Sequence, residues 1–429
     1  ENGGNMKYTL RNYQQEAVDA ALGYFNGNFR NPVLMVLPTG SGKSLIIASI
    51  VSSLPGNTLV FQPTKEILAQ NVDKLKSYGV SDFGVYSASF NSKKIRKMTY
   101  ATIGSVIRKK ELFSHFDNVI IDECHLVNAK GGMYQEFLEC VQGKVLGLTA
   151  TPYRLTTDGY GGSIMKFLTR TRPRIFYKVI HITQNGELFQ SGYLAKLKYF
   201  KCGEFRTNQL RLNSTGADYT DQSVKQYYEK INFQDRILNT VHECLKMGRK
   251  NILVFTRFIW EAEYVAECLG DVATIVTSET KKKDRDKVID DFKSGRVKVV
   301  ANVGVLSIGF DFPELETIIL ARPTRSLALY YQMIGRGIRI HPEKKSAILI
   351  DMCNNYGRFG KVEDLRIVTP RNDTFFISSN GRKLTNIYYD DIATLQDDDI
   401  ADFNPDLFDK NNDDPKYLFN PRGQQAMRF

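Results

Sequence analysis

The sequence predicts an α/β protein built on two doubly wound parallel sheets. Short apolar runs alternate with helical segments between about residues 33 and 148, and the same alternation resumes after residue 234. Polar motifs follow directly after several of these runs, at the strand ends where functional residues of parallel sheets gather. A chain of 429 residues is also long for one core, which favours more than one domain.

The first strand leads into a glycine-bearing loop. Five apolar residues end at Leu37, Pro-Thr-Gly-Ser-Gly-Lys-Ser follows, and an apolar helical run comes next. The strict phosphate-loop pattern has glycine where this chain has Leu37, yet strand, loop and helix stand in the order that a triphosphate requires. Backbone N–H groups, a lysine and a serine hydroxyl there suit phosphates and Mg²⁺. We therefore expect ATP and Mg²⁺ as cofactors, bound by Thr39, Gly40, Ser41, Gly42, Lys43 and Ser44.

An acidic pair ends a later apolar strand. Asp122 and Glu123 directly follow Val119-Ile120-Ile121. Alone, such a pair is an ordinary surface turn. Beside a phosphate loop, the first carboxylate can hold Mg²⁺, partly through water, and the second can activate the attacking water. We predict these roles for Asp122 and Glu123, with Lys43 as a third catalytic residue.

The second half of the chain has no phosphate loop but carries two arginines on one helical face. Gln332, Arg336 and Arg339 stand at i, i+4 and i+7. They could be solvent-exposed charges. The functional interpretation is that they reach across to the γ-phosphate held by the first half, as an arginine finger supplied in cis does. We predict all three as catalytic.

A glutamine near the start of the chain has two interpretations. Gln14 stands early in an amphipathic helix just before the phosphate loop. It could be an exposed helix residue, or its amide could pair with both the donor and the acceptor of an adenine edge.

Taken together, these residues resemble the motifs of superfamily 2 helicases and translocases over about residues 8 to 355. The motifs stand in the family's order: Leu10-Arg11-x-Tyr13-Gln14, Gly40-Ser41-Gly42-Lys43-Ser44, Pro63-Thr64-x-Glu66, Ile103-Gly104-Ser105, Asp122-Glu123-Cys124-His125, Thr149-Ala150-Thr151, Phe255-Thr256-Arg257, Gly309-Phe310-Asp311 and Gln332-x-x-Gly335-Arg336-x-x-Arg339. The sequence looks closest to RadD-type and phage UvsW-like branch-migration helicases. RadD-type proteins carry a cysteine-rich zinc segment, whereas no cysteine follows Cys353 here.

The resemblance implies further roles, residue by residue. It assigns Arg11, Gln14, Gly309 and Asp311 to the nucleotide. It assigns Pro63, Thr64, Gly104, Ser105, Thr256 and Arg257 to the nucleic-acid strand. It assigns His125, Thr149 and Thr151 to coupling between the domains. It also implies two RecA-like domains with an ATP cleft between them, and a small C-terminal extension.

The expected boundaries follow the motifs and the composition. We expect the first RecA-like domain over residues 1–165, an irregular connecting segment over 166–233, the second domain over 234–360, and an acidic, aromatic extension over 361–429. The net charge is +11, but ten aspartates against one lysine between residues 390 and 414 leave +20 on the rest. That surplus favours a polyanion partner. The acidic tail could mimic DNA, dock a partner protein or stay disordered, and its aspartate-rich composition favours disorder.

The predicted function is an ATP-dependent DNA helicase or translocase acting on branched, forked or single-stranded DNA in recombination, repair or replication. The alternatives are an RNA helicase, the duplex-DNA motor of a restriction-type complex, or a nucleic-acid-binding scaffold without ATPase activity. No apolar run approaches the ~20 residues of a membrane span. Six cysteines without a C-x-x-C pair argue against zinc and favour the cytoplasm of a bacterium or phage-infected cell. We expect a monomer.

Overall fold

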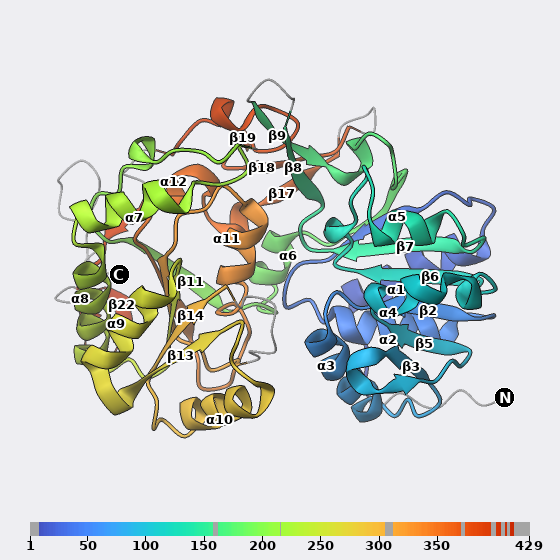
Figure 1. The fold of residues 1–429 in the computed structure, drawn as a ribbon, viewed down its shortest axis with the longest axis horizontal. Helices are drawn as coiled ribbons and strands as arrows, with labels where there is room; N and C mark the ends of the chain where they lie inside the picture. Colours follow the sequence, from blue (N-terminus) through green and yellow to red (C-terminus); the bar gives the residue numbers. More distant parts are fainter. Residues whose placement is uncertain are drawn as a thin grey trace.

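The computed structural model describes residues 8–157, 162–214, 216–304, 312–369, 374–395, 400–404, 408–409 and 412–415. The described chain forms two lobes, each built on a largely parallel sheet (Figure 1). Helix α6 (Asn185–Gln190) lies between the lobes in this view, and strands β8 (Tyr153–Thr157) and β9 (Ser163–Phe167) lie above it. The predicted fold class, α/β with two doubly wound parallel sheets, is confirmed.

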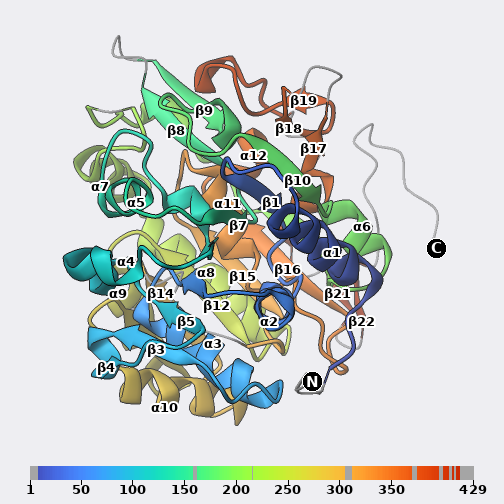
Figure 2. The ribbon, with the colours of Figure 1, turned by 90° about the vertical axis from the view of Figure 1, so that its right-hand side faces the viewer.

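The first sheet has eight strands in the order β10-β1-β7-β6-β2-β5-β3-β4, and only the β3–β4 pair is antiparallel. Its strands are β1 (Val33–Val36), β2 (Thr58–Phe61), β3 (Gly84–Ser87), β4 (Ser92–Lys93), β5 (Met98–Ala101), β6 (Asn118–Asp122), β7 (Lys144–Thr149) and β10 (Lys178–Ile182). The longer helices of this lobe are α1 (Asn12–Asn26), α2 (Lys43–Ser53) and α3 (Lys65–Ser77), with short α4 (Ile103–Val106) and α5 (Met133–Leu138). Figure 2 looks onto this lobe.

The second sheet has seven strands, all parallel, in the order β13-β14-β12-β15-β16-β11-β20. They are β11 (Lys196–Lys201), β12 (Ile252–Thr256), β13 (Ala273–Thr277), β14 (Val299–Val303), β15 (Thr317–Ala321), β16 (Ser346–Asp351) and β20 (Ala401–Asp402). The helices are α7 (Asp221–Lys230), α8 (Phe233–Lys246), α9 (Ile259–Leu269), α10 (Lys282–Lys293), α11 (Leu327–Ile334) and α12 (Asn355–Phe359). Within the described residues, we find no helix with the length and apolarity that a membrane crossing needs.

The central strands are buried on both faces, which explains why they read as continuous apolar runs. In β1, Val33 and Met35 pack into one cluster, and Leu34 and Val36 into another on the opposite face. The cluster that contains Leu34 extends to residues of the second lobe such as Tyr331. The two lobes therefore share a packed core on one side of their junction.

The segment 166–233, which we expected to be irregular, supplies strands to both sheets. Its strand β10 pairs with β1 in the first sheet, and its strand β11 pairs with β16 in the second. Both alternate lysine or histidine with apolar residues, so neither forms the apolar run from which the other strands were recognised. The strand content therefore corrects the expectation of irregularity, whereas the boundaries at 165 and 234 stay predictions.

The C-terminal extension folds partly against the first lobe. It contains a three-stranded antiparallel sheet of β17 (Arg366–Val368), β18 (Phe376–Ser379) and β19 (Arg382–Lys383), and a backbone pair β21 (Phe408–Asp409) and β22 (Asn412–Pro415). The Phe375 ring stacks on Phe167 of β9 with centroids 5.7 Å apart, and Asn386 accepts the Phe167 N–H at 3.1 Å. The extension thus braces the hairpin β8–β9 (Figure 1).

Candidate active site

The phosphate loop connects the end of β1 to the start of α2. Gly40 and Gly42 both have left-handed backbone conformations, with φ of 82° and 79°. A Cβ atom at Gly42 would lie 2.6 Å from Nε2 of Gln14. Only glycine combines this backbone with such a close approach, so the loop can curl before α2 begins at Lys43.

The lysine of the loop contacts the acidic pair at the end of β6. Lys43 Nζ lies 2.9 Å from Oε1 of Glu123, and Asp122 accepts the backbone N–H of Glu123 at 2.9 Å. Burial lowers the pKa of Lys43, but Glu123 and Asp122 outweigh it and raise the pKa overall. The lysine therefore stays charged at the site.

The pKa values of the two carboxylates are shifted in opposite directions. Burial and the neighbouring Glu123 raise the pKa of Asp122 to about 7, against the effect of Lys43. Burial also acts to raise the pKa of Glu123, but Lys43 and His125 lower it well below its usual range. Glu123 is consequently the ionised group, while Asp122 is a buried carboxylate that a cation would stabilise.

The predicted coupling residues form one hydrogen-bonded network. His125 Nδ1 lies 3.3 Å from Oε2 of Glu123 and 2.9 Å from Oγ1 of Thr149. Thr149 Oγ1 accepts the backbone N–H of Thr151 at 3.0 Å, and the Thr149 carbonyl accepts the N–H of Leu37. The acidic pair is thus connected to the start of the phosphate loop.

Sequence reasoning missed the partner of Ser44. Its hydroxyl donates to Oδ1 of Asn71 on α3 at 2.6 Å, and Asn71 donates to Oε1 of Gln62 at 2.7 Å. Because the hydroxyl hydrogen points to Asn71, the oxygen lone pairs of Ser44 remain suited to a cation. Asn71 gave no signal in the sequence, since it stands inside an amphipathic helix. The hydroxyl of Ser44 and the buried carboxylate of Asp122 are the kind of oxygen ligands that suit Mg²⁺, which takes few protein oxygens and completes its shell with phosphate and water.

Gln14 contacts the phosphate loop. Its Nε2 donates to the Ser41 carbonyl at 2.9 Å, its Oε1 accepts the N–H of Arg11 at 2.9 Å, and Tyr13 donates to the same Ser41 carbonyl. Each end of the amide thus makes one hydrogen bond within the chain and keeps one further N–H or lone pair, so the adenine contact stays a prediction. The Arg11 guanidinium lies 4.2 Å over the ring of Tyr193, a residue that sequence reasoning did not identify.

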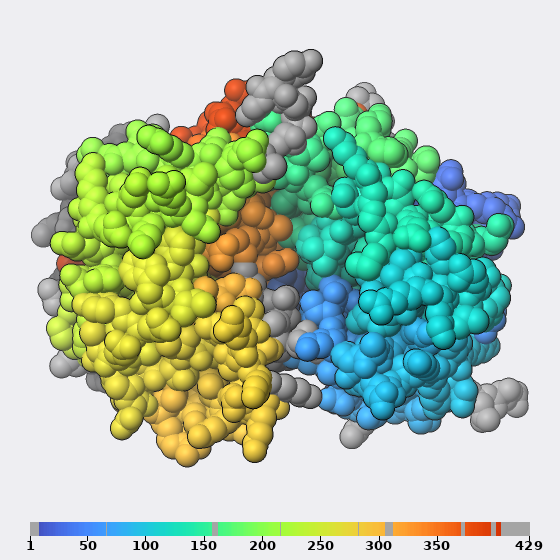
Figure 3. Space-filling view, in the orientation of Figure 1, coloured from blue at the N-terminus to red at the C-terminus, as the bar shows by residue number. Residues whose placement is uncertain are grey.

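Two elements of the second lobe reach this site. A Cβ atom at Gly335 would lie 2.7 Å from Cγ2 of Thr39, so the end of α11 packs directly on the phosphate loop. Burial lowers the pKa of Arg336, and Glu123 opposes that shift, which places this arginine within the field of the acidic pair. Gln332 is half-buried in α11, but this helix ends at Ile334, so Arg336 lies in the turn that follows and Arg339 lies beyond that turn. The predicted helical face shared by Gln332, Arg336 and Arg339 is therefore wrong, because glycines at positions 335 and 337 follow the end of the helix. Figure 3 shows the molecule hollowed between the two lobes.

Arg339 lies in a different environment from Arg336. Burial lowers the pKa of Arg339, and Arg339 in turn helps lower the pKa of Lys74 and that of Lys344, the latter to about 8. Arg339 is therefore close enough to Lys74 of α3 and to Lys344 to influence both cations. The predicted γ-phosphate contacts of Arg336 and Arg339 both stay predictions, and Glu123 acts on the pKa of Arg336.

Two of the predicted strand-binding motifs line the strand ends of the first sheet. Thr64 caps α3 by accepting the N–H of Ile67, and Ser105 accepts the N–H of Ala88 at 3.1 Å. Gly104 is exposed, with open space where a Cβ atom would stand. Pro63 is half-buried beside Thr64. This edge of the first lobe is available to a nucleic-acid backbone.

The predicted strand contacts at Thr256 and Arg257 look different in the structure. Thr256 is buried. The side chain of Arg257 is 7% exposed and pairs with Asp218 and Asp221 at 3.3 and 2.8 Å. Its guanidinium is thus engaged inside the second lobe, and its predicted contact with a nucleic-acid strand stays a prediction. Gly309 and Asp311 lie outside the described residues.

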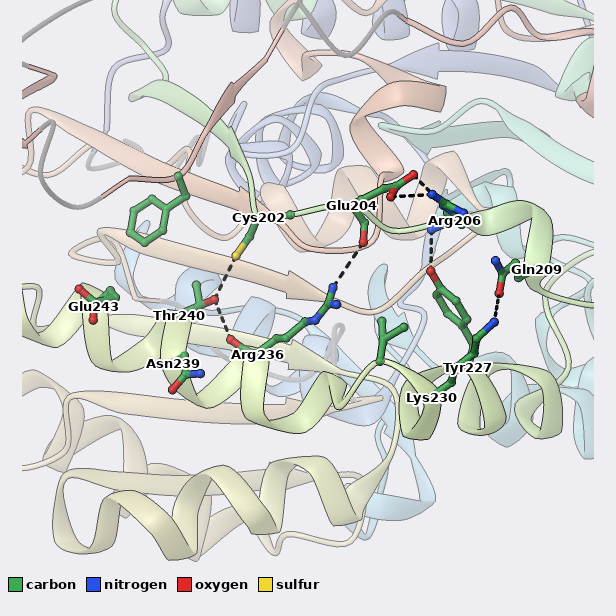
Figure 4. Close-up of a pocket in the computed structure, with 13 residues that line it drawn as sticks. Cys202, Glu204, Arg206, Gln209, Tyr227, Lys230, Arg236, Asn239, Thr240 and Glu243 are labelled. Carbon is green, nitrogen blue, oxygen red and sulfur yellow. Dashed lines mark hydrogen bonds and ion pairs between the residues drawn. The ribbon is translucent and has the colours of Figure 1, made fainter.

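The second lobe contains a separate hollow of about 620 Å³ between β11, α7 and α8 (Figure 4). Its charged groups are paired with one another or with neutral partners. Arg206 Nε lies 2.7 Å from Glu204, and Lys230 donates to Gln209 at 3.2 Å. The hollow shares no lining residue with the phosphate loop or the acidic pair and displays no convergent unpaired charge for a ligand.

Comparisons with known proteins agree with this arrangement. Residues 7–154 match the family "Type III restriction enzyme, res subunit", and residues 230–341 match "Helicase conserved C-terminal domain". A 51.5 kDa protein of a Lactococcus phage is 31% identical over 329 residues, which cover 75% of this chain and 66% of that protein. The ATP-dependent DNA helicase uvsW of Enterobacteria phage T4 is 24% identical, covering 82% of this chain and 70% of that protein.

Structural similarity extends over both lobes. The ATP-dependent Type ISP restriction-modification enzyme LlaBIII bound to DNA superposes with a TM-score of 0.57 at 18% identity, covering 80% of this chain and 27% of that one. The chain spans between 51% and 66% of the length of the first three relatives in sequence. The two family matches cover both lobes and include the phosphate loop, the acidic pair, and α11 with the two arginines that follow it. The chain therefore belongs to the superfamily 2 helicases and translocases.

Proposed function

We propose that the chain is an ATP-dependent DNA helicase or translocase that acts on branched or forked DNA in recombination, repair or replication. The observation that carries this proposal is the meeting of two lobes at one site. Lys43 pairs with Glu123 in the first lobe at 2.9 Å, and Arg336 lies in the field of Glu123 from the second lobe. A phosphate loop that needs the other lobe for its arginine links hydrolysis to domain movement.

The residues of the first lobe bind ATP and activate the water that attacks it. The N–H groups of the phosphate loop and the charge of Lys43 hold the phosphates of ATP, and Ser44 with Asp122 would hold Mg²⁺. When bound, Mg²⁺ neutralises charge on the phosphate oxygens. Glu123 is ionised and hydrogen-bonded to His125, so it is the group that orients the attacking water and accepts its proton.

The residues of the second lobe complete the site. Arg336, in the turn after α11, stabilises the charge that develops on the γ-phosphate, and Gln332 belongs to the last turn of α11 before it. ATP draws the lobes together through this arginine, and hydrolysis releases them. A strand held at Thr64 and Ser105 on the first lobe would then be tightened and released in turn.

DNA is the proposed partner for two reasons. The chain is similar to a protein named ATP-dependent DNA helicase, and its charge outside the acidic tail is strongly positive. Contacts to phosphates read no base sequence, so we propose a preference for the shape of forks or branches. The described cysteines are all free, which fits the reducing cytoplasm of a bacterium or a phage-infected cell, and we propose that the chain acts as a monomer.

A second candidate is a motor that moves on duplex DNA without separating its strands. The match of the first lobe to "Type III restriction enzyme, res subunit" favours it. A triplex-displacement assay on duplex DNA detects such movement, and a forked-duplex unwinding assay detects strand separation. Displacement of the third strand without unwinding would favour the second candidate.

The test of the main proposal is ATP hydrolysis with single-stranded, duplex, forked and RNA ligands. We expect forked DNA to give the largest stimulation. Lys43→Ala should abolish turnover and leave salt-sensitive DNA binding intact, and Arg336→Ala should spare ATP binding but not hydrolysis. Lys246→Ala and Arg296→Ala, each removing an exposed cation, are the matched controls. ATPase activity without nucleic-acid stimulation refutes the motor, and stimulation by RNA alone refutes the DNA assignment.

A further inference from the structure

The side chain of Tyr331 lies where four parts of the chain meet. Its hydroxyl accepts the backbone N–H of Thr39 in the phosphate loop at 3.1 Å and donates to Oδ1 of Asn185 at 2.6 Å. Asn185 begins α6, and its Nδ2 donates to the carbonyl of Val362 at 3.0 Å. These three bonds form a cross-lobe relay of Thr39, Tyr331, Asn185 and Val362, which joins the phosphate loop, α11, α6 and the C-terminal extension.

The relay is buried and closely packed. Tyr331 is 2% exposed, and burial raises the pKa of Tyr331, so the hydroxyl stays neutral and able to donate. The neighbouring cavity, lined in part by Pro38, Thr151 and Asn185, measures about 30 Å³. That volume holds about one or two water molecules. The ring therefore cannot swing aside unless the phosphate loop or α11 moves with it.

The position of Tyr331 connects it to the proposed chemistry. It immediately precedes Gln332, and the helix that carries both leads to Arg336. The Thr39 N–H belongs to the loop that holds the phosphates. We propose that Tyr331 is a positioning residue for ATP hydrolysis, whose hydroxyl fixes the position of the phosphate loop relative to α11 and the turn after it that carries Arg336. This inference rests on the proposed function.

The far end of the relay is anchored in the extension. The amide of Gln184 bonds both the N–H and the carbonyl of Ile367, at 3.0 and 2.9 Å. The hydroxyl of Tyr199 accepts the N–H of Val362 at 3.0 Å and donates to Glu363 at 2.6 Å. Movement of the phosphate loop is therefore transmitted through Tyr331 and Asn185 to the start of the C-terminal extension. That part of the extension is itself bonded to Tyr199 of β11 and to Gln184, the residue before α6.

The preceding residue offers a matched control. Tyr330 is also buried on α11, but its hydroxyl donates to the carbonyl of Gly360 at 2.9 Å, within the second lobe. Each of the variants Tyr331→Phe and Tyr330→Phe removes one buried hydroxyl. Tyr330→Phe removes the bond to the Gly360 carbonyl, whereas Tyr331→Phe removes the bonds to the Thr39 N–H and to Oδ1 of Asn185. They differ in whether the lost bond crosses to the phosphate loop.

The experiment measures the nucleic-acid-stimulated ATPase of the full chain together with thermal unfolding. We expect Tyr331→Phe to lower kcat about three- to tenfold, the effect of one net hydrogen bond, with KM for ATP within twofold. Tyr330→Phe should lower the melting temperature about as much as Tyr331→Phe does, but it should leave kcat unchanged. Asn185→Ala should lower kcat like Tyr331→Phe, and the double variant Asn185→Ala/Tyr331→Phe should be no slower than the slower single variant.

The opposing outcomes are distinct. Equal kcat in Tyr331→Phe and Tyr330→Phe overturns the inference and leaves the proposed function intact. Multiplying effects in the double variant also overturn it, because residues of one relay cannot act independently. If Tyr331→Phe does not fold, unchanged kcat in Asn185→Ala overturns the inference instead. Absence of ATPase in the unaltered chain overturns the proposed function and the inference with it.

Discussion

Replacing Glu123 with glutamine separates catalysis from nucleotide binding. One carboxylate oxygen lies 2.9 Å from Lys43 Nζ and the other lies 3.3 Å from His125 Nδ1. Glutamine keeps the size of the side chain and removes both its charge and its ability to accept the water proton. Because Lys43 and His125 hold the pKa of Glu123 well below its usual range, the unaltered group is ionised at every working pH.

The expected loss follows from the role of the carboxylate. A positioned general base contributes about 10²- to 10⁴-fold, so Glu123→Gln should lower kcat by that factor, or about 3 to 5.5 kcal/mol of barrier. ATP binding should change less than about threefold, because the loop N–H groups and Lys43 remain. Steady-state ATPase and titration with a fluorescent ATP analogue measure the two quantities.

A surface pair provides the control for this change. Glu136 lies 2.8 Å from Lys110, and its side chain is 54% exposed. Glu136→Gln should leave kcat unaltered, since exposed pairs contribute little. Turnover by Glu123→Gln within tenfold of the unaltered chain would show that another group takes the proton, and parallel loss of ATP binding would show a structural role.

Three further changes test the architecture. Gly335→Ala introduces a Cβ 2.7 Å from Cγ2 of Thr39 and should abolish stimulated ATPase, while Gly23→Ala, with open space around it, should retain full ATPase and a melting temperature at least as high. Burial raises the pKa of Glu261 to about 8 from 4.5, so the folded chain keeps a proton that the unfolded chain releases, and stability falls as pH rises through this window. Melting temperatures measured between about pH 5 and pH 9 should therefore fall less steeply for Glu261→Gln than for the unaltered chain. An equally steep fall in both proteins contradicts this prediction. Asn386→Ala removes the bonds to Phe167 and Phe375 at a residue with φ of 62° and should cost about 1–3 kcal/mol by urea denaturation.

The phosphate loop and the acidic pair were predictable because each is a short, continuous stretch of sequence. Gly40 to Ser44 curl as a loop because strand, glycines and helix are contiguous, and Asp122-Glu123 stand at the end of a recognisable strand. The local pattern failed for β10 and β11, because His181 interrupts the apolar run of β10 and Lys198 interrupts that of β11. It also gave no means of knowing that Asp218 and Asp221 engage Arg257, since that pairing joins residues more than thirty positions apart.

The sequence by itself determined the two-sheet fold and the parts of the nucleotide site, because strand periodicity and motif order are properties of short segments. The tertiary structure decided which of those parts work together. It brought Arg336 rather than Arg339 into the field of Glu123 and gave Ser44 the partner Asn71. It also joined Thr39 to Tyr331 across the lobes. Contacts of this kind depend on how two packed bodies meet, and no spacing along one chain encodes that geometry.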